Sequence, residues 1–274
     1  MSLRAPSAAL LLAGVLLTYS GCLEAAQPDP CEERVAAVGL DHVVLAVHDL
    51  PTASREFEER LGFSLKPGRV HDNGLRNVHV RFTDGTALEL MATGAGTADE
   101  LSAAYDRFLQ DGEGGAFVAL DAGPADTVLR RLGELADSVR VVRSAAMEWV
   151  SFPEGHPLRP VFFVHVRSRS PDAPGQLAHR NETTGIAEVW LESSDPNGLA
   201  GLLDRFGARA CAAGRGPDGV AGLRFGLAGG SLGVVPTAVG AGRARILAVA
   251  MRTPHPPDST VSHGVRLTWR TSGI

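Results

Sequence analysis

The segment GLDHVVLAVHD at residues 39–49 recurs without gaps as GIAEVWLESSD at residues 185–195. Both copies carry a glycine, an aliphatic residue, Val, Leu and a closing Asp at matching positions. From residue 41 to residue 47 of the first copy, side chains alternate between two largely apolar faces, and His42 interrupts the apolar run. The pattern predicts a strand buried on both faces, and its recurrence predicts that the strand opens a repeated structural unit.

A helix is expected directly after this strand. The apolar residues Ala53, Phe57 and Leu61 recur four positions apart, as they do on one face of a helix. Asp49 can cap the start of the helix, and Gly62 can end it. The first strand is therefore followed by an amphipathic helix.

Three further strands complete a βαβββ unit, at about residues 63–66, 77–82 and 86–91. We interpret Asp84-Gly85 as a two-residue hairpin loop between the last two strands. Such a loop sets Phe82 opposite Ala87 and Val80 opposite Glu89. It places Glu89 on a face with the apolar residues Val78, Val80, Phe82 and Met91. A carboxylate on such a face needs a partner, because burying an unpaired charge is costly.

The rest of the chain repeats this organisation. Residues 115–166 are a more divergent unit, and residues 98–112 are expected to be a helical connector before it. The unit that begins at Gly185 has a helix with an apolar stripe, then a hairpin about Gly229-Gly230. The strands expected at 245–253 and 264–269 either begin a fourth, truncated unit or complete the third. We divide the sequence into a signal peptide (1–21), a linker (22–38), a pair of units (39–167), a loop (168–184) and a third unit with C-terminal strands (185–274).

The first residues, MSLRAPSAALLLAGVLLTYSGC, have the short basic start and apolar run of an export signal. The ending Ser20-Gly21-Cys22 resembles a bacterial lipobox, although Tyr19 stands where that pattern prefers an aliphatic residue. We therefore predict an exported protein that a lipid on Cys22 anchors to the membrane of the bacterial cell envelope. An ordinary cleaved signal is the alternative.

Two other cysteines, Cys31 and Cys211, remain in the chain. An oxidising compartment would permit a disulfide between them. The net charge of −5 and the lack of a basic stripe argue against a nucleic-acid partner. The sequence also offers no GxSxG nucleophile elbow, no Walker glycine-lysine loop, no HExxH and no GxGxxG that follows a strand, which weakens the enzyme classes that depend on them.

Repeated βαβββ units with a His in the first strand and a Glu in the fourth resemble the vicinal oxygen chelate superfamily, and in particular its glyoxalase-like domain proteins. The resemblance covers about residues 39–236 and rests on the order of four segments: LDHVVLAVHDL, LGF, DGTALELM and TTGIAEVWLESSDP. It implies an α+β fold with open, barrel-like sheets. It also implies a divalent metal ion (Zn, Fe, Mn, Ni or Co) that binds neighbouring oxygens of a small molecule in lyase, isomerase or dioxygenase chemistry.

Carried onto this sequence, the resemblance makes His42 and Glu89 metal ligands, and His165 is the candidate third ligand. Imidazole and carboxylate suit these metals. Glu188 takes the place of His42 in the recurrence and is the candidate catalytic base, while Val234 falls at the place of Glu89. The divergent unit has Phe117 at the place of His42.

Other interpretations of these residues stay open at this point. A lone His in a buried strand is often a hydrogen-bonded core residue, and Arg81 could pair with Glu89. His165 could belong to an ordinary strand end, and His179 could line the mouth of a cavity or be solvated. The chain could also be a metal-free binding module for a small molecule, or a lipid-tethered structural protein of the envelope.

Overall fold

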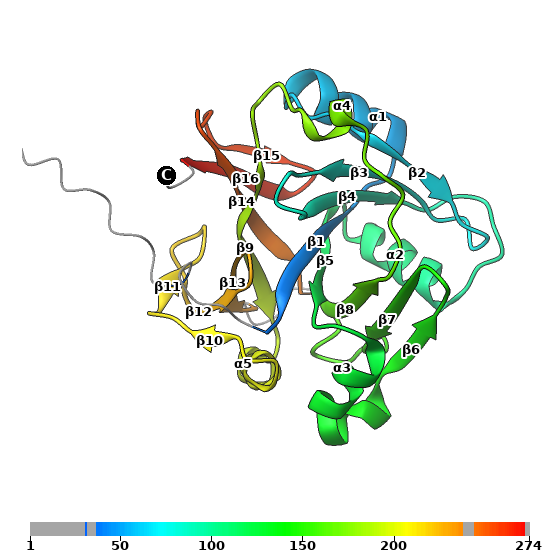
Figure 1. Cartoon of the computed structure of the whole chain (residues 1–274), viewed down its shortest axis with the longest axis vertical. Coiled ribbons are helices and arrows are strands. Elements are labelled where there is room, and N and C mark those ends of the chain that lie inside the picture. The colour runs from blue at the N-terminus through cyan, green and yellow to red at the C-terminus, as the bar shows by residue number, and fades with distance from the viewer. Residues whose placement is uncertain (1–30, 32–36, 238–243, 272–274) are drawn as a thin grey trace, which may run out of the picture.

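The computed structural model describes residue 31, residues 37–237 and residues 244–271 (Figure 1). The predicted signal peptide and Cys22 lie outside the described residues. Within the described part of the chain, no helix has both the length and the apolar character needed to cross a membrane.

The first unit has the predicted βαβββ order. It contains β1 (Gly39–Ala46), α1 (Leu50–Arg55), the π-helical turn η1 (Glu56–Arg60), β2 (Lys66–Val70), β3 (Arg76–Arg81) and β4 (Ala87–Ala92). The Asp49 side chain caps α1 by accepting a hydrogen bond from Thr52 N at 2.7 Å. Gly62 follows the helical segment with a φ of 78°, a conformation that glycine adopts without strain.

The second unit follows the connector helix α2 (Glu100–Gln110). It contains β5 (Gly114–Asp121), α3 (Ala125–Leu132), the 3₁₀ turn η2 (Gly133–Ser138), β6 (Arg140–Arg143), β7 (Met147–Ser151) and β8 (Val161–Val166). A long connection with the short helix α4 (Pro174–Leu177) leads to the third unit. That unit contains β9 (Gly185–Ser193), α5 (Pro196–Arg205), β10 (Arg209–Ala210), β11 (Gly214–Arg215), β12 (Ala221–Leu227) and β13 (Gly230–Pro236).

The C-terminal strands form a truncated fourth unit. They are β14 (Ile246–Thr253), β15 (Thr260–Ser262) and β16 (Val265–Thr271). Strand β14 pairs in parallel with β16, and β16 pairs antiparallel with β15. The first unit pairs its strands in the same way, since β1 is parallel to β4 and β4 is antiparallel to β3.

The strands make a 16-stranded sheet system with two parts. Units one and two give the first part, in the order β2-β3-β4-β1-β5-β8-β7-β6. The later units give β10-β12-β13-β9-β14-β16-β15, and β11 also pairs with β12. A single bridge between Ile246 and Gly115 joins β14 to β5. Few helices accompany these open sheets (Figure 1), so the predicted α+β fold of repeated βαβββ units is confirmed.

One large apolar core lies on one face of both parts. Val43 and Leu45 of β1 belong to it, as do Val189 and Leu191 of β9, and the helices α1, α3 and α5 add their apolar sides. The opposite face of the first part carries a second cluster, which includes Val44, Ala46, Met91, Phe117, Phe162 and Val164. We call this second surface the His42 face.

The sequence recurrence extends to the irregularities of the strands. The β1–β5 register shifts between Leu40 and His42, which makes Asp41 an extra residue in β1. The β9–β14 register shifts between Ile186 and Glu188, the matching positions in the recurrence. Both copies therefore have a β-bulge next to His42 or Glu188. Such a bulge changes the direction of nearby side chains.

Cys31 and Cys211 form a disulfide with a Cα–Cα separation of 5.5 Å. The bridge links residues 180 positions apart in the sequence. It therefore ties the segment before β1 to the segment just after β10.

Candidate functional site

The bulge in β1 brings Asp41 and His42 together. In a regular strand, neighbouring side chains point to opposite faces, but here the Asp41 carboxylate lies 2.6 Å from His42 Nδ1. The edge of the His42 ring meets the Phe162 ring, with the ring centres 5.6 Å apart. The imidazole therefore has a fixed orientation on the His42 face.

The other ring nitrogen of His42 faces Glu89. Nε2 lies 3.3 Å from Glu89 Oε2, and the two side chains are 16% and 10% exposed. Strand β4 supplies the carboxylate because its parallel register sets Glu89 beside Val44, two residues along β1 from His42. The structure thus brings together the two residues singled out as the first metal ligands.

The predicted hairpin register was wrong by one residue. His79 lies opposite Glu89, and Arg81 lies opposite Ala87. The reason is the loop, because Phe82 N bonds to Thr86 O at 3.0 Å and leaves the three residues 83–85 between the strands. A shift of one residue turns every side chain of β3 to the other face. Val78 and Val80 therefore pack against the large core, not beside Glu89.

The polar residues Asn77 and His79 of β3 lie on the same face as Glu89. The predicted register had placed Val78 and Val80 there. Asn77 Nδ2 donates to Glu89 Oε1 at 2.5 Å and lies 3.2 Å from His79 Nε2. Asn77 is 9% exposed, so it is a buried amide beside a buried carboxylate. Assuming a three-residue Thr-Asp-Gly loop, and not the two-residue Asp-Gly loop, would have predicted the correct register and placed both residues on the face of Glu89.

The charges of this group support one another. Burial alone would lower the pKa of His42, but hydrogen bonds to Asp41 and Glu89 and their negative charges raise it to about 9. Burial alone would raise the pKa of Glu89, but contacts with His42, His79 and Asn77 lower it to about 2. Without a metal ion, His42 is thus an imidazolium between two carboxylates.

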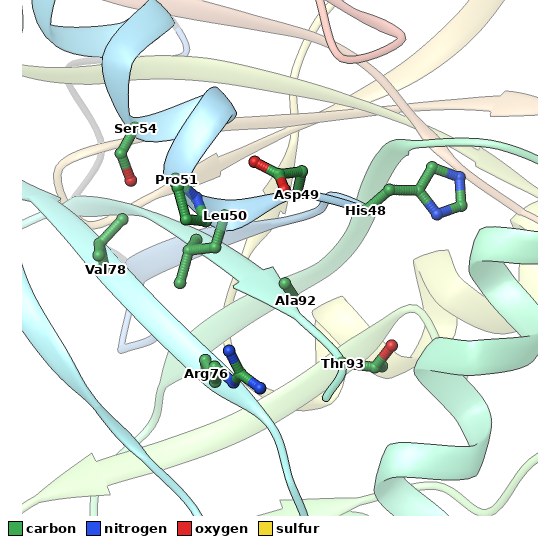
Figure 2. A pocket seen from close by; sticks show the side chains of 9 residues that line it. All are labelled: His48, Asp49, Leu50, Pro51, Ser54, Arg76, Val78, Ala92 and Thr93. Carbon is green, nitrogen blue, oxygen red and sulfur yellow. The ribbon is translucent and has the colours of Figure 1, made fainter. Parts of the chain in front are cut away.

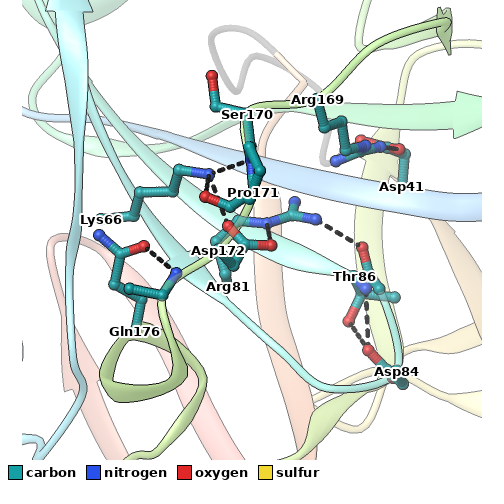
Figure 3. A network of polar contacts seen from close by, with 12 residues as sticks. Asp41, Lys66, Arg81, Asp84, Thr86, Arg169, Ser170, Pro171, Asp172 and Gln176 are labelled. Carbon is teal, nitrogen blue, oxygen red and sulfur yellow. Dashed lines mark hydrogen bonds and ion pairs between the residues drawn. The ribbon is translucent and has the colours of Figure 1, made fainter.

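A strap between the second and third units passes beside Asp41, which Arg169 contacts (Figure 3). We define the strap as residues 167–178. Arg169 forms an ion pair with Asp41 Oδ2, and Asp172 pairs with Lys66 at 2.7 Å. Arg81 also pairs with Asp172, at 3.6 Å, so it is not the partner of Glu89. Burial alone would raise the pKa of Asp41, but His42 and Arg169 lower it to about 2.

Aromatic side chains fill the rest of the His42 face. Tyr105 of α2 meets the edge of Phe117 at 5.4 Å, and Phe117 meets Phe162 at 6.3 Å between ring centres. The Arg159 guanidinium lies 4.8 Å from the centre of the Phe117 ring. Burial raises the pKa of Tyr105 well above its usual range, and the negative charge of Glu89 adds to this effect. These rings form the apolar side of the site, and His42 and Glu89 are largely shielded from solvent.

His165 does not join His42 and Glu89. It lies in β8 on the side of Val161 and Phe163, which belong to the large core, whereas Phe162 and Val164 lie on the His42 face. Its Nδ1 is 3.4 Å from Asp121 Oδ1. The alternation of side chains along a strand explains why the expected third ligand points to the other side of the sheet.

Glu188 lies in the second part of the sheet system, where β14 and β5 separate its strand from β1. Its side chain is 1% exposed and accepts a hydrogen bond from Arg224 at 2.8 Å. Arg270 forms a second ion pair with it. Two cations therefore hold this carboxylate away from the His42 face, and the structure does not bring the expected catalytic base to the expected ligands.

The position equivalent to Glu89 in the third unit is Gly233, not Val234. Trp190 lies beside Gly233 in the parallel β9–β13 register, just as Val44 lies beside Glu89. The Trp190 ring fills the space, because a Cβ on Gly233 would lie 2.4 Å from it. In the third unit, the Trp190 ring packs against Gly233 at the position where the first unit has the carboxylate of Glu89.

His179 is a satisfied core residue. Its Nδ1 accepts a hydrogen bond from Ser64 N at 3.0 Å, and its Nε2 donates to the Arg81 carbonyl at 3.0 Å. Burial lowers its pKa. Phe63 and Phe82 meet the edges of the ring at 5.5 and 5.3 Å. It is therefore neither solvated nor part of a cavity mouth.

The chemistry of the donors at His42 and Glu89 fits a divalent metal ion in part. Their facing atoms are an imidazole nitrogen and a carboxylate oxygen, and Asp41 holds the far nitrogen of the ring, as carboxylates do for many metal-bound histidines. Among the described residues, however, no group of three or more His, Cys, Asp and Glu side chains is arranged as a metal site. The remaining ligands of an ion would have to be water or substrate oxygens.

A surface groove of about 370 Å³ lies elsewhere, beside the start of α1 (Figure 2). Its lining includes Leu50, Arg76 and Val78, and neither His42 nor Glu89 belongs to it. The His42–Glu89 pair and this groove are therefore separate features of the structure.

The chain matches one known sequence family. The sequence model of a family described as "Glyoxalase-like domain" matches residues 40–207. A search of curated proteins gives no match. A hypothetical protein from Staphylococcus aureus is similar in structure, with a TM-score of 0.65 and 12% identity over 86% of this chain and 99% of that one.

Two further solved structures share the fold. A mutant of 4-hydroxymandelate synthase from Streptomyces coelicolor has a TM-score of 0.53 and 13% identity, over 78% of this chain and 71% of that one. A halotolerant catechol dioxygenase has a TM-score of 0.53 and 11% identity, over 86% of this chain and 87% of that one. At these identities, the similarity establishes the fold alone.

Proposed function

Because the chain belongs to the glyoxalase-like domain family, and its repeated units resemble the vicinal oxygen chelate superfamily, we propose that it is a metal-dependent enzyme that acts on a small molecule. In this proposal His42 and Glu89 hold one divalent ion on the His42 face. Zn, Fe, Mn, Ni and Co are the candidates, since all accept nitrogen and oxygen donors. The substrate supplies two neighbouring oxygens, and the chemistry is of the lyase, isomerase or dioxygenase kind.

One distance carries the proposal. Donor atoms that each lie about 2.0–2.2 Å from a shared ion are separated from each other by roughly 3 Å. His42 Nε2 and Glu89 Oε2 are 3.3 Å apart, with the ring held by Asp41 on its other side. The two donors are thus close to the spacing that an ion requires.

When bound, the metal would act as a Lewis acid toward the substrate oxygens. The residues of the chain have distinct parts in this arrangement. Asp41 keeps the Nε2 atom of His42 directed at Glu89. Phe117, Phe162 and Tyr105 form the apolar surroundings that limit access of water and strengthen electrostatic interactions at the pair.

A second candidate function is metal-free binding of a small molecule. It is favoured by the proton on His42, which already neutralises the pair, with the pKa of His42 at about 9. It is also favoured by the side chains of α2, which pack onto the His42 face. In this alternative His42 and Glu89 would contribute hydrogen bonds to a ligand and no metal ion.

Metal titration separates the two candidates. The protein is freed of metal with a chelator and titrated with Co²⁺ and Zn²⁺ by calorimetry. The proposal predicts one ion per chain and a weakening in His42→Gln and Glu89→Gln beyond the roughly 10- to 100-fold that loss of an outer partner costs. The matched control is His255→Gln, whose ring is 80% exposed. Absence of binding by the unchanged protein would leave the metal-free alternative.

We also propose that the protein is exported and that a lipid on Cys22 anchors it to the cell envelope. The disulfide between Cys31 and Cys211 supports export, because such bridges persist in oxidising compartments. Intact-mass measurement of the protein from bacterial membranes tests the anchor. A lipid mass that Cys22→Ala removes is expected, and an unmodified chain that begins elsewhere would contradict it.

A further inference from the structure

We propose that Asn77 is a positioning residue of the metal site, with the task of directing one oxygen of Glu89 toward the ion. The inference rests on the proposed function, since it concerns a ligand of that ion. It adds a residue on a third strand, β3, to the pair that β1 and β4 contribute.

The orientation of the Asn77 amide is fixed by its partners. Its Oδ1 accepts a hydrogen bond from Arg69 N at 2.9 Å, so the other atom of the amide is the nitrogen donor. That nitrogen donates to Glu89 Oε1 at 2.5 Å and has His79 Nε2 as a second neighbour at 3.2 Å. The two hydrogens of the NH₂ group thus have one acceptor each.

The backbone of β2 is shaped to reach this amide. The β2–β3 register shifts between Pro67 and Val70, and the irregular stretch contains Gly68 and Arg69. A Cβ on Gly68 would lie 2.1 Å from Asn77 Oδ1, so only glycine allows the close approach. The irregularity of β2 and the glycine therefore serve the same contact.

The two carboxylate oxygens of Glu89 therefore have different partners. Oε1 is bound by Asn77, while Oε2 faces His42 Nε2 at 3.3 Å. A carboxylate held in this way offers one oxygen to an ion and cannot rotate freely. Asn77 thus does for Glu89 what Asp41 does for His42, and each ligand has its own outer partner.

Cobalt binding tests this assignment in the full chain. Co²⁺ is titrated into metal-free protein and into Asn77→Ala, Asn77→Leu and Gly68→Ala, with affinity and the visible Co²⁺ spectrum as readouts. Leu keeps most of the volume of Asn but cannot donate. Gly68→Ala keeps the amide but presses a methyl group against its oxygen and against the backbone carbonyl of Asn77. Asn73→Ala is the matched control, because Asn73 donates to Asp99, the residue that caps α2, and not to Glu89. Titrations are made well below the melting temperature of each variant.

We expect all three variants to bind Co²⁺ about 10-fold or more weakly, with an altered spectrum, while Asn73→Ala matches the unchanged protein. Unchanged affinity and spectrum in folded Asn77→Leu and Gly68→Ala, with binding still lost in His42→Gln, would overturn the role of Asn77 alone. A failure of the unchanged protein to bind Co²⁺ would overturn both this role and the proposed function.

Discussion

Glu188 occupies in β9 the position that His42 occupies in β1, and a shift of strand register precedes each of them. The two side chains nevertheless have opposite surroundings. His42 lies between two carboxylates, and Glu188 lies between two arginines. The repeated unit has thus kept its backbone and exchanged the chemistry at this position.

Replacing Glu188 is expected to reduce stability and leave metal binding intact. Glu188→Gln removes the carboxylate charge that Arg224 and Arg270 share. Breaking a buried pair typically costs 3–5 kcal/mol, and we expect about 3 kcal/mol because Arg270 is 44% exposed. Urea unfolding measures the loss, with Glu192→Gln in the same strand as the control. A loss of Co²⁺ affinity as large as that of Glu89→Gln would show instead that Glu188 belongs to the metal site.

The Trp190–Gly233 contact makes a second prediction. Gly233→Ala would press a methyl group into the Trp190 ring, and overpacking of this kind costs about 2 kcal/mol. Gly201→Ala in α5 is the control, because nothing lies within 4 Å of a Cβ there. The melting temperatures should fall for the first variant only. Equal effects of the two substitutions would contradict the packing described for the third unit.

The charged group about His42 predicts a pH dependence for the metal-free protein. The pKa of His42 is raised from 6.5 to about 9, so its stabilising contribution is complete below pH 6.5 and is lost as the pH rises toward 9. The pKa values of Asp41 and Glu89 are lowered to about 2, so their contributions are lost as the pH falls toward 2. The three contributions are therefore greatest at about pH 5–6.

Unfolding free energies of the unchanged protein and of His42→Gln, measured with a chelator present, check this dependence. The difference between the two proteins should be largest near pH 5–6 and should shrink toward pH 9. A difference that stays constant across this range would show that the ion pairs of His42 do not stabilise the fold.

Loss of the disulfide should lower the stability of the fold. Removing a native bridge typically costs about 2–5 kcal/mol, because the cross-link restricts the unfolded chain. Cys31→Ser, Cys211→Ser and the double variant should therefore melt at similar, lowered temperatures. If reductant leaves the melting temperature of the unchanged protein where it was, the bridge does not form in solution.

The sequence was sufficient for the repeated units because their signal is local. The recurrence of residues 39–49 carried the strand and the helix cap at Asp49, and Gly62 marked the end of the helix; each of these depends on near neighbours. The pairing of His42 with Glu89 also followed, through the family resemblance. These predictions needed the pattern along the chain and not the exact contact between distant segments.

The remaining parts of the site depended on register and on distant contacts. One extra residue in the hairpin loop exchanged Val80 for His79 opposite Glu89 and hid Asn77 as well. An error of one residue in the alignment of the two hairpins likewise led to Val234, instead of Gly233, as the equivalent of Glu89. The strap contact of Arg169 with Asp41 joins residues 128 positions apart, and no local pattern predicts such a pair.

The proposed function requires that His42 and Glu89 share a metal ion. A crystal structure of the protein soaked in Co²⁺, with anomalous scattering recorded at the cobalt edge, tests it most directly. We predict one strong anomalous peak about 2.0–2.2 Å from both His42 Nε2 and Glu89 Oε2. A map with no peak at this pair, or with cobalt bound only at exposed histidines such as His255, would contradict the account.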